Sequence, residues 1–200
     1  MDSLVWPYRT PGIPDELFEE LPGIPLTKRE IRVLLMSQLR LKPDSVFWDI
    51  GAGTGTIPVE VGLLCPDSQI FAIERDEEVA SLIQRNCDRF SVKNVTVVEG
   101  NAPECLEPLK AKPDCICIEG GQSLKTILEV AWQRLTTGGT LVATATNFES
   151  LYTISESLAA LRMRNIEVVQ SAINRLENRG IRQVFAALDP LFIISGTKME

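Results

Sequence analysis

The feature that most limits the fold of this chain is a short apolar run that passes directly into closely spaced glycines. Val46-Phe47-Trp48-Asp49-Ile50 is followed by Gly51-Ala52-Gly53-Thr54-Gly55. The apolar run predicts a buried strand, and the pattern over 56–64 predicts a helix after the turn. This order is typical of open α/β sheets, in which ligands bind beyond the carboxyl ends of the strands. Glycine allows the backbone to lie close to such a ligand and to adopt positive φ.

Strand and helix patterns continue to alternate along the chain. Further strands are predicted at 69–73, 95–98, 114–118 and 140–145, and further helices at 77–90, 124–135 and 149–163. Such alternation predicts a parallel sheet with helices on both faces. Two closing strands, about 166–174 and 183–195, have no helix between them, so we expect a terminal hairpin with one antiparallel strand. The predicted fold class is therefore α/β, with a Rossmann-like, mostly parallel sheet of seven strands.

The beginning of the chain departs from this pattern. Prolines recur through residues 1–26 and exclude a long helix there, because proline lacks the amide donor. Thr27 and Glu30 have the spacing of a capping box, which predicts a helix from about 28 to 40. We therefore divide the chain into an irregular N-terminal arm, 1–26, and a single domain, 27–200. The arm either packs on the domain or covers a substrate pocket as a lid.

The composition excludes several classes of function. The chain has 200 residues and no histidine, which rules out histidine-metal sites and a Ser-His-Asp triad, and we predict no metal site. Its net charge of −7 argues against broad nucleic-acid binding, which needs a basic face. Cys115 and Cys117 alternate with isoleucines and predict core packing in a reducing compartment. No apolar run is long enough to span a membrane and no secretory leader is visible, so we expect a cytoplasmic protein.

The spacing of the glycines distinguishes two kinds of nucleotide-binding turn. The dinucleotide fingerprint GxGxxG needs its third glycine where this chain has Thr56. The pattern here is GxGxG, which resembles motif I of class I S-adenosylmethionine-dependent methyltransferases. The resemblance implies a class I methyltransferase sheet whose cofactor, S-adenosylmethionine, lies on the turn from Gly51 to Gly55. We expect Asp49 either to reach the methionine end of the cofactor through water or to order the turn.

Polar residues follow the next three predicted strands. Glu74 lies close to the spacing of roughly 20 residues at which an acid binds ribose hydroxyls; the alternative is a solvated loop acid. Asn101 and Ala102 are expected to bond the adenine edge, although Gly-Asn is also ordinary turn chemistry. Glu119 ends the fourth strand and is expected either to hold the methionine amino group or to face the substrate.

Nearly the whole chain, about 12–197, is similar to one methyltransferase family. The similar segments are Gly12 to Phe18, Leu26 to Arg32, Trp48 to Gly55, Ala72 to Arg75, Val95 to Glu104 and Asp189 to Gly196. The chain resembles the decarboxylating cobalt-precorrin-6B methyltransferases of cobalamin biosynthesis, which act at ring carbon 15. Many methyltransferases share the methyl-donor motifs. The resemblance to this particular family therefore depends on the arm, the Leu-Thr-Lys start of the first helix and the Pro-x-Phe-Ile ending.

Carried over by position, the resemblance implies cofactor contacts at Thr27, Gly51 to Gly55, Glu74 and Ala102. The sequence departs from the family at two places: Glu119-Gly120-Gly121-Gln122-Ser123 stands where the family has a Gly-Gly-Ser-Gly-like loop, and Asn101 replaces an acid on the adenine side. The family also implies a homotetramer, and a partner methyltransferase that acts at carbon 5.

The implied reaction is methyl transfer from a sulfonium to a ring carbon, with loss of carbon dioxide from a neighbouring acetate arm. A corrin precursor is a tetrapyrrole that carries many carboxylates, which arginine binds well. Lys28 and Arg29 open the first helix, and Arg175, Arg179 and Arg182 flank a predicted loop between the closing strands. We expect some of these residues to hold the substrate's carboxylates; the alternative is a solvated basic surface. The sequence predicts no residue that assists decarboxylation.

The sequence leaves three alternative functions. The first is a methyltransferase whose substrate is another small molecule, a protein or RNA. The second is a non-catalytic nucleotide-binding subunit, and the third is a nicotinamide-dependent oxidoreductase. The acidic charge argues against RNA, and Thr56 argues against a nicotinamide cofactor. The intact Gly51, Gly53, Gly55 and Glu74 argue against a non-catalytic subunit, although a fold alone never decides a function.

Overall fold

A computed structural model describes residues 5–199, and its centre is a seven-stranded sheet in the order β3-β2-β1-β4-β5-β9-β6. The strands are β1 (Val46–Ile50), β2 (Gln69–Glu74), β3 (Val95–Glu99), β4 (Cys115–Ile118), β5 (Thr140–Ala145), β6 (Arg164–Gln170) and β9 (Phe192–Thr197). All pairs among β1 to β5 are parallel, whereas β9 runs antiparallel to both β5 and β6. The predicted mostly parallel sheet of seven strands with an antiparallel terminal strand is confirmed.

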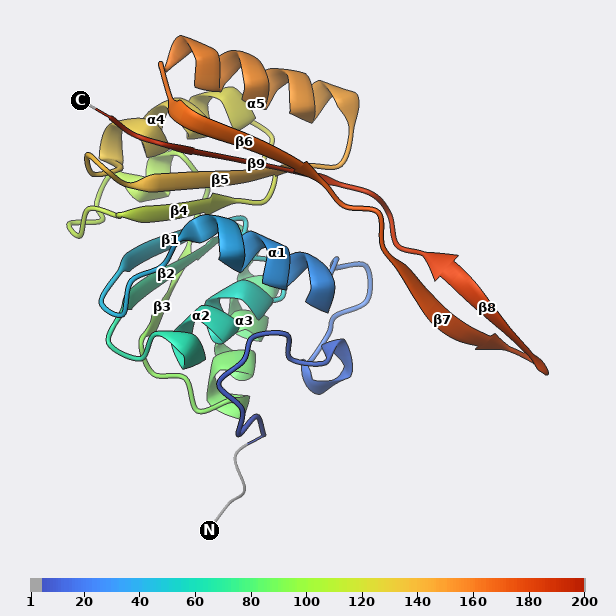
Figure 1. Cartoon of the computed structure of the whole chain (residues 1–200). Helices are drawn as coiled ribbons and strands as arrows, with labels where there is room; N and C mark the ends of the chain where they lie inside the picture. The colour runs from blue at the N-terminus through green and yellow to red at the C-terminus, as the bar shows by residue number, and fades with distance from the viewer. Residues whose placement is uncertain (1–4, 200) are drawn as a thin grey trace.

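Helices cover both faces of this sheet, as predicted (Figure 1). They are α1 (Arg29–Leu39), α2 (Thr56–Leu64), α3 (Glu77–Arg89), α4 (Leu124–Arg134) and α5 (Phe148–Ala160). Side chains alternate along a strand, so Phe47 packs with α1 and α2, whereas its neighbour Trp48 packs with α4 and α5. Both side chains are fully buried. Burial on both faces explains why the strands read as continuous apolar runs.

The register of the parallel strands brings four loops to one edge of the sheet. Ile50, the last residue of β1, lies opposite Ile73 of β2 and Ile118 of β4. From β1 the chain continues to β2 and β3 on one side of β1, and it then crosses to β4 on the other side. In an open α/β sheet, a crevice forms where the strand order reverses in this way. The predicted site residues follow these strand ends, so the fold gathers them at one crevice.

The N-terminal arm is irregular and packs against the domain. Its described part contains a single short 3-10 helix, η1 (Asp15–Leu17). Ile13, Phe18 and Leu26 are buried in a core cluster with side chains of α2 and α3. Burial of these anchors removes apolar surface from water and holds the arm in place.

The predicted capping box at the start of α1 is wrong. The helix begins at Arg29 after Lys28, whose side chain forms no cap, and the amide of Arg29 donates to Oδ1 of Asp15 at 2.9 Å. Thr27 instead donates its hydroxyl proton to Glu119, and the carboxylate of Glu30 binds Arg175. Both residues have long-range partners, which local spacing does not reveal.

The prediction of two long closing strands is also wrong. The segment forms four strands, of which β6 and β9 join the main sheet. The other two, β7 (Asn174–Arg179) and β8 (Arg182–Ala187), pair with each other as an antiparallel ribbon. The ribbon extends away from the body of the protein (Figure 1). Arg179 at the end of β7 and Arg182 at the start of β8 flank the turn of the ribbon, as predicted, whereas Arg175 lies near the start of β7.

Candidate functional site

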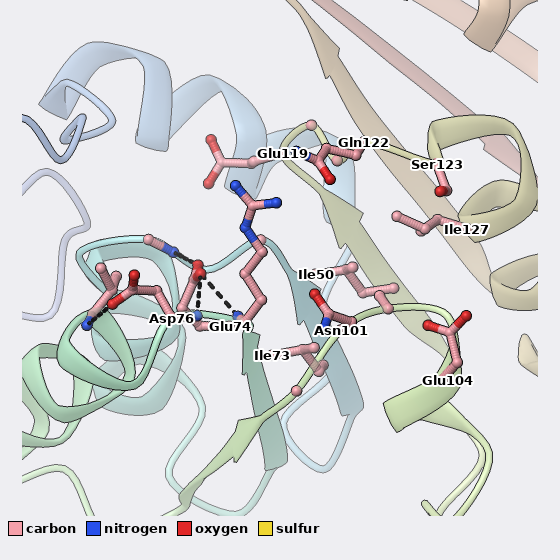
Figure 2. A pocket seen from close by; sticks show the side chains of 18 of the residues that line it. Ile50, Ile73, Glu74, Asp76, Asn101, Glu104, Glu119, Gln122, Ser123 and Ile127 are labelled. Carbon is pink, nitrogen blue, oxygen red and sulfur yellow. Dashed lines mark hydrogen bonds between the residues drawn. The ribbon is translucent and has the colours of Figure 1, made fainter.

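The crevice at the carboxyl ends of the strands contains a cavity of about 860 Å³. This volume falls within the range of roughly 300–1,000 Å³ that is usual for small-molecule sites. The loops after β1, β2, β3 and β4 line it together with part of the arm. Figure 2 shows Glu119 and Gln122 on one side of the cavity, and Glu74 and Asn101 on the other.

The glycine turn lets the backbone form one wall of this cavity. Gly51 has φ +82°, and a Cβ there would lie 2.9 Å from the carbonyl oxygen of Glu119. A side chain at this position would therefore collide with the backbone at the end of β4. Gly53 also lines the cavity, and Thr54 donates its hydroxyl proton to the carbonyl of Pro25 in the arm, 3.2 Å away. The turn thus leaves the cavity open and fixes the arm beside it.

Glu74 is held at the cavity wall by three backbone amides. Its Oε1 accepts from the amides of Arg75 at 2.9 Å and Asp76 at 3.2 Å, and its Oε2 accepts from Gly53 at 3.2 Å. Figure 2 marks these bonds with dashed lines. A carboxylate has about four lone-pair sites, so the side chain is fixed and can still accept further hydrogen bonds.

The loop after β3 faces the same space. Asn101 and Ala102 line the cavity, and the amide of Gly100 donates to the carbonyl of Glu74 at 2.9 Å. This bond fixes the distance between the loop and the end of β2. The side-chain amide of Asn101 and the backbone of Ala102 thus line the same cavity as the apolar side chains of Ile73 and Val79.

Two carboxyl groups lie close together behind and beside the glycine turn. Asp49 is fully buried, and neither of its carboxyl oxygens has a hydrogen-bond partner among the described residues. Burial, followed by the nearby charge of Glu119, raises the pKa of Asp49 well above its usual value. Burial also raises the pKa of Glu119 to about 7, although a hydrogen bond from Thr27 and the charge of Arg32 oppose the change.

The structure brings six of the predicted cofactor residues to the cavity. They are Gly51, Gly53, Glu74, Asn101, Ala102 and Glu119. Ala52 and Thr54 are buried on the other side of the turn, and Gly55 packs against Ile83 of α3. Asp49 lies beneath the turn, and Thr27 contacts the cavity wall through its bond to Glu119.

Sequence reasoning missed other residues of the cavity wall. Asp76 and Ser123 follow predicted strands closely, and their place after a strand end was the available signal. Ile24 and Pro25 come from the arm, and no local pattern links them to the strand ends.

The predicted substrate-binding cations lie outside the lining of the cavity. Arg175 binds Glu30 and also lies 2.9 Å from Asp15, so its charge is already compensated. Arg179 is exposed and pairs with Glu177 at 3.3 Å, and Arg182 is exposed on β8. At the start of α1, Lys28 is half-buried and Arg29 is exposed.

The predicted core role of two cysteines is confirmed. Cys115 and Cys117 lie in the core cluster that α1 and α2 cover. Burial raises the pKa of the Cys115 thiol to about 12 and that of Cys117 well above its usual value. Such thiols stay protonated and unreactive at neutral pH. Between residues 5 and 199, no helix is long and apolar enough to cross a membrane.

The fold and the site together define the class of the protein. A mostly parallel seven-stranded sheet, with a glycine turn and a fixed carboxylate at its carboxyl edge, is the arrangement of a class I methyltransferase. A family model described as a precorrin methyltransferase domain matches residues 17–198. The chain therefore belongs to the precorrin methyltransferase family.

Individual relatives agree with this assignment. A protein of Pyrobaculum calidifontis named probable cobalt-precorrin-6B C(15)-methyltransferase (decarboxylating) is 39% identical over 194 residues, 96% of this chain and 98% of its own. The cobalt-precorrin-6B C(15)-methyltransferase (decarboxylating) of Salmonella typhimurium is 33% identical over 93% of this chain and 96% of its own. The crystal structure of precorrin-6y C5,15-methyltransferase from Geobacter metallireducens superposes with a TM-score of 0.87 at 34% identity, over 94% of this chain and 98% of that one.

Proposed function

We propose that this protein is an S-adenosylmethionine-dependent C-methyltransferase that acts at carbon 15 of cobalt-precorrin-6B and releases carbon dioxide from an acetate arm of the ring, in cobalamin biosynthesis. The names of relatives that match nearly the whole chain support this substrate. The observation that carries the proposal is the carboxylate of Glu74, which the amide of Gly53 holds against the cavity.

The residues of the cavity fit S-adenosylmethionine. Glu74 offers acceptors for the two ribose hydroxyls, and Asn101 and Ala102 offer an acceptor and a donor for the adenine edge. The absent side chain of Gly51 leaves room for the amino-acid end of the cofactor. When bound, the cofactor supplies a methyl group activated as a sulfonium.

The chain itself contributes placement and the exclusion of water. Methyl transfer from a sulfonium needs little acid-base assistance, so the absence of histidine is no obstacle. In-line placement of two reactants accounts for roughly 7–11 kcal/mol of a barrier. Ile50, Ile73, Val79 and Ile127 form the apolar part of the cavity wall and keep water from the reacting atoms.

The carboxylates of the substrate require cations beyond the cavity. Arg182 is exposed on the ribbon and forms no salt bridge among residues 5–199, and the exposed Arg179 pairs with Glu177 at 3.3 Å. Lys28 and Arg29 remain candidates at the start of α1, whereas Arg175 must first give up its bonds to Glu30 and Asp15. Replacing Arg179 with Ala is expected to weaken tetrapyrrole binding and to leave S-adenosylmethionine affinity intact; equal loss of both contradicts this role.

Self-association through the ribbon β7–β8 completes the proposal. Leu176 and Phe185 are cross-strand partners and are 54% and 76% exposed, and Ile181 at the turn is fully exposed. A two-stranded ribbon alone is marginally stable in water. Apolar side chains on both strands and at the turn are therefore expected to be covered by further copies of the chain, in line with the homotetramer that the family implies.

The experiment that tests the function uses methyl-labelled S-adenosylmethionine and a panel of corrin precursors with and without cobalt. Product masses report methyl gain and loss of carbon dioxide. We expect both with cobalt-precorrin-6B, and neither above background when Glu74 is replaced with Ala. The matched control is Glu77→Ala, an exposed acid in the first turn of α3. Methyl transfer to none of the precursors contradicts the proposal.

A further inference from the structure

Four acidic residues line the cavity: Glu74, Asp76, Glu104 and Glu119. Glu119 differs from the other three in its hydrogen bonds and its exposure. Glu74 accepts from three backbone amides, and Asp76 caps α3 by accepting from the amides of Glu78 and Val79. Amide donors stabilise the ionised carboxylate. Glu104 is exposed to solvent. Glu119 receives only one hydrogen bond among the described residues, from the hydroxyl of Thr27 to Oε2 at 2.9 Å.

The position of Glu119 follows from the alternation of β4. Asp49 and Cys117 are opposite each other in the register of β1 and β4, so their side chains share one face of the sheet. Glu119 is two residues beyond Cys117 and points toward the same face, where α1 and the arm cover the sheet. Figure 2 shows its carboxyl group at the border of the cavity, on the side of α1. The group therefore reaches the cavity while most of its surface is withdrawn from water.

The surroundings of Glu119 contain more negative than positive charge. The charged or titratable groups that act on it or line the same cavity are Arg32 of α1, Asp49 of β1, Cys117 of β4, and Glu74, Arg75, Asp76 and Glu104. Arg32 is already bound to Asp15 and Glu60. Burial raises the pKa of Glu119 to about 7, so the acid form is well populated near neutral pH. The bond from Thr27 occupies Oε2 and leaves Oε1 to carry the proton.

We propose that the carboxyl group of Glu119 is the proton donor for the decarboxylation, delivering its proton to the carbon that loses carbon dioxide. This inference rests on the proposed function. The ring first takes a proton from water at a ring nitrogen. The bond between the acetate methylene carbon and its carboxylate then breaks, carbon dioxide leaves, and the electron pair enters the protonated ring as an exocyclic double bond. The methylene carbon then takes the proton of Glu119 and becomes a methyl group. Glu119 is left ionised and regains a proton from water, while the protonated ring releases one to water.

A general acid in this position is expected to contribute about 100-fold or more to the step it assists. Thr27 acts as a positioning residue, because its hydroxyl fixes the orientation of the carboxyl group. Asp49 lies behind the turn, and burial together with the charge of Glu119 raises the pKa of Asp49 well above its usual value.

The test measures methyl transfer, carbon dioxide release and cofactor affinity separately for Glu119→Gln. We use single-turnover reactions with cobalt-precorrin-6B, mass analysis of the product, and calorimetry with S-adenosylmethionine. We expect carbon dioxide release to fall about 100-fold or more, with cofactor affinity changed less than about 3-fold. The wild-type rate of carbon dioxide release should decrease as pH rises through about 7, and the variant's residual rate should lose this dependence. Glu119→Asp should recover part of the rate.

Glu107→Gln is the matched control, because Glu107 is exposed and lies outside the cavity lining. Unchanged carbon dioxide release in Glu119→Gln overturns the proposal. Loss of cofactor affinity that accounts for loss of both reactions also overturns it, and assigns Glu119 to holding the methyl donor. If the wild-type protein binds S-adenosylmethionine but neither methylates nor decarboxylates any precursor, the proposed function is wrong, and this inference, which rests on it, is wrong as well.

Discussion

Arg32 and Glu60 form an ion pair inside the protein, with Arg32 Nε 2.7 Å from Glu60 Oε1 and side-chain exposures of 0% and 1%. The same carboxylate accepts the backbone amides of Gly12 at 2.6 Å and Ile13 at 3.1 Å. The pair therefore joins α1 to α2 and ties the arm to both. The residues of the arm that border the cavity depend on this anchor, because they lie between it and the start of α1.

Replacing Arg32 with Met is expected to destabilise the protein by about 3–5 kcal/mol, because Glu60 is left buried without its partner. Arg40→Met is the matched control, since Arg40 pairs with Glu167 at 2.8 Å on the surface, where both side chains are 49% exposed. An exposed pair contributes about 0–1 kcal/mol. Denaturant unfolding measures both changes. Similar losses in the free energy of unfolding for the two variants would show that the buried pair stabilises the protein no more than the exposed pair.

The substitution Gly55→Ala tests how the glycine turn packs against α3. Gly55 has φ +80°, and a Cβ there would lie 2.9 Å from the side chain of Ile83. Gly23 has nearly the same φ, +82°, with no atom within 4 Å of a built Cβ. Both alanine variants bear the left-handed penalty of about 1–2 kcal/mol. We expect Gly55→Ala to lose about 1–3 kcal/mol more in thermal or denaturant unfolding, from overpacking. Equal losses would mean that Ile83 simply moves aside.

The raised pKa of Glu119 predicts a pH dependence of stability that needs no substrate. Its folded pKa of about 7 exceeds its usual 4.5, so the folded state binds the proton more tightly. The contribution is complete below about pH 4.5 and is lost as pH rises through about 7. Relative to Glu119→Gln, the wild-type protein should therefore lose about 1–3 kcal/mol across this interval. Unfolding curves at several pH values measure the difference; a constant difference would mean that Glu119 titrates normally.

Self-association predicts a strong effect of polar substitutions on the ribbon. Leu176→Ser combined with Phe185→Ser should shift the protein toward monomers in sedimentation measurements, because it removes the apolar cross-strand pair. Phe148→Ser is the control: Phe148 is 89% exposed but lies on α5, away from the ribbon. An unchanged sedimentation coefficient for the ribbon variant, or an equal change for the control, would remove the ribbon from the interface.

The sheet was predictable because its signals are local. Short apolar runs mark β1, which ends at the glycine turn, and β2, and helical spacing marks α3 and α4. The ribbon was not predictable, because alternating residues show that a segment is extended and not which strand it pairs with. The sequence therefore predicts two strands, about 166–174 and 183–195, whereas this part of the chain forms four strands that divide between the main sheet and a separate pair.

In the cavity, too, the residues marked by local signals were predictable and the long-range contacts were not. Gly51, Glu74 and Asn101 lie at or just after the ends of strands, so the rule that ligands bind at the carboxyl ends predicted their position at the cavity. The bond between Thr27 and Glu119 joins residues 92 positions apart. No local spacing signals such a contact, and the spacing of Thr27 and Glu30 pointed instead to a helix cap that does not form.

The most direct test of the whole account is a crystal structure of the protein grown with S-adenosylmethionine. We predict the cofactor in the cavity of about 860 Å³, with its ribose hydroxyls on the carboxylate of Glu74, its adenine beside Asn101 and Ala102, and its methionine end along Gly51. Cofactor bound elsewhere on the protein, or a ribose that makes no contact with Glu74, would contradict the account.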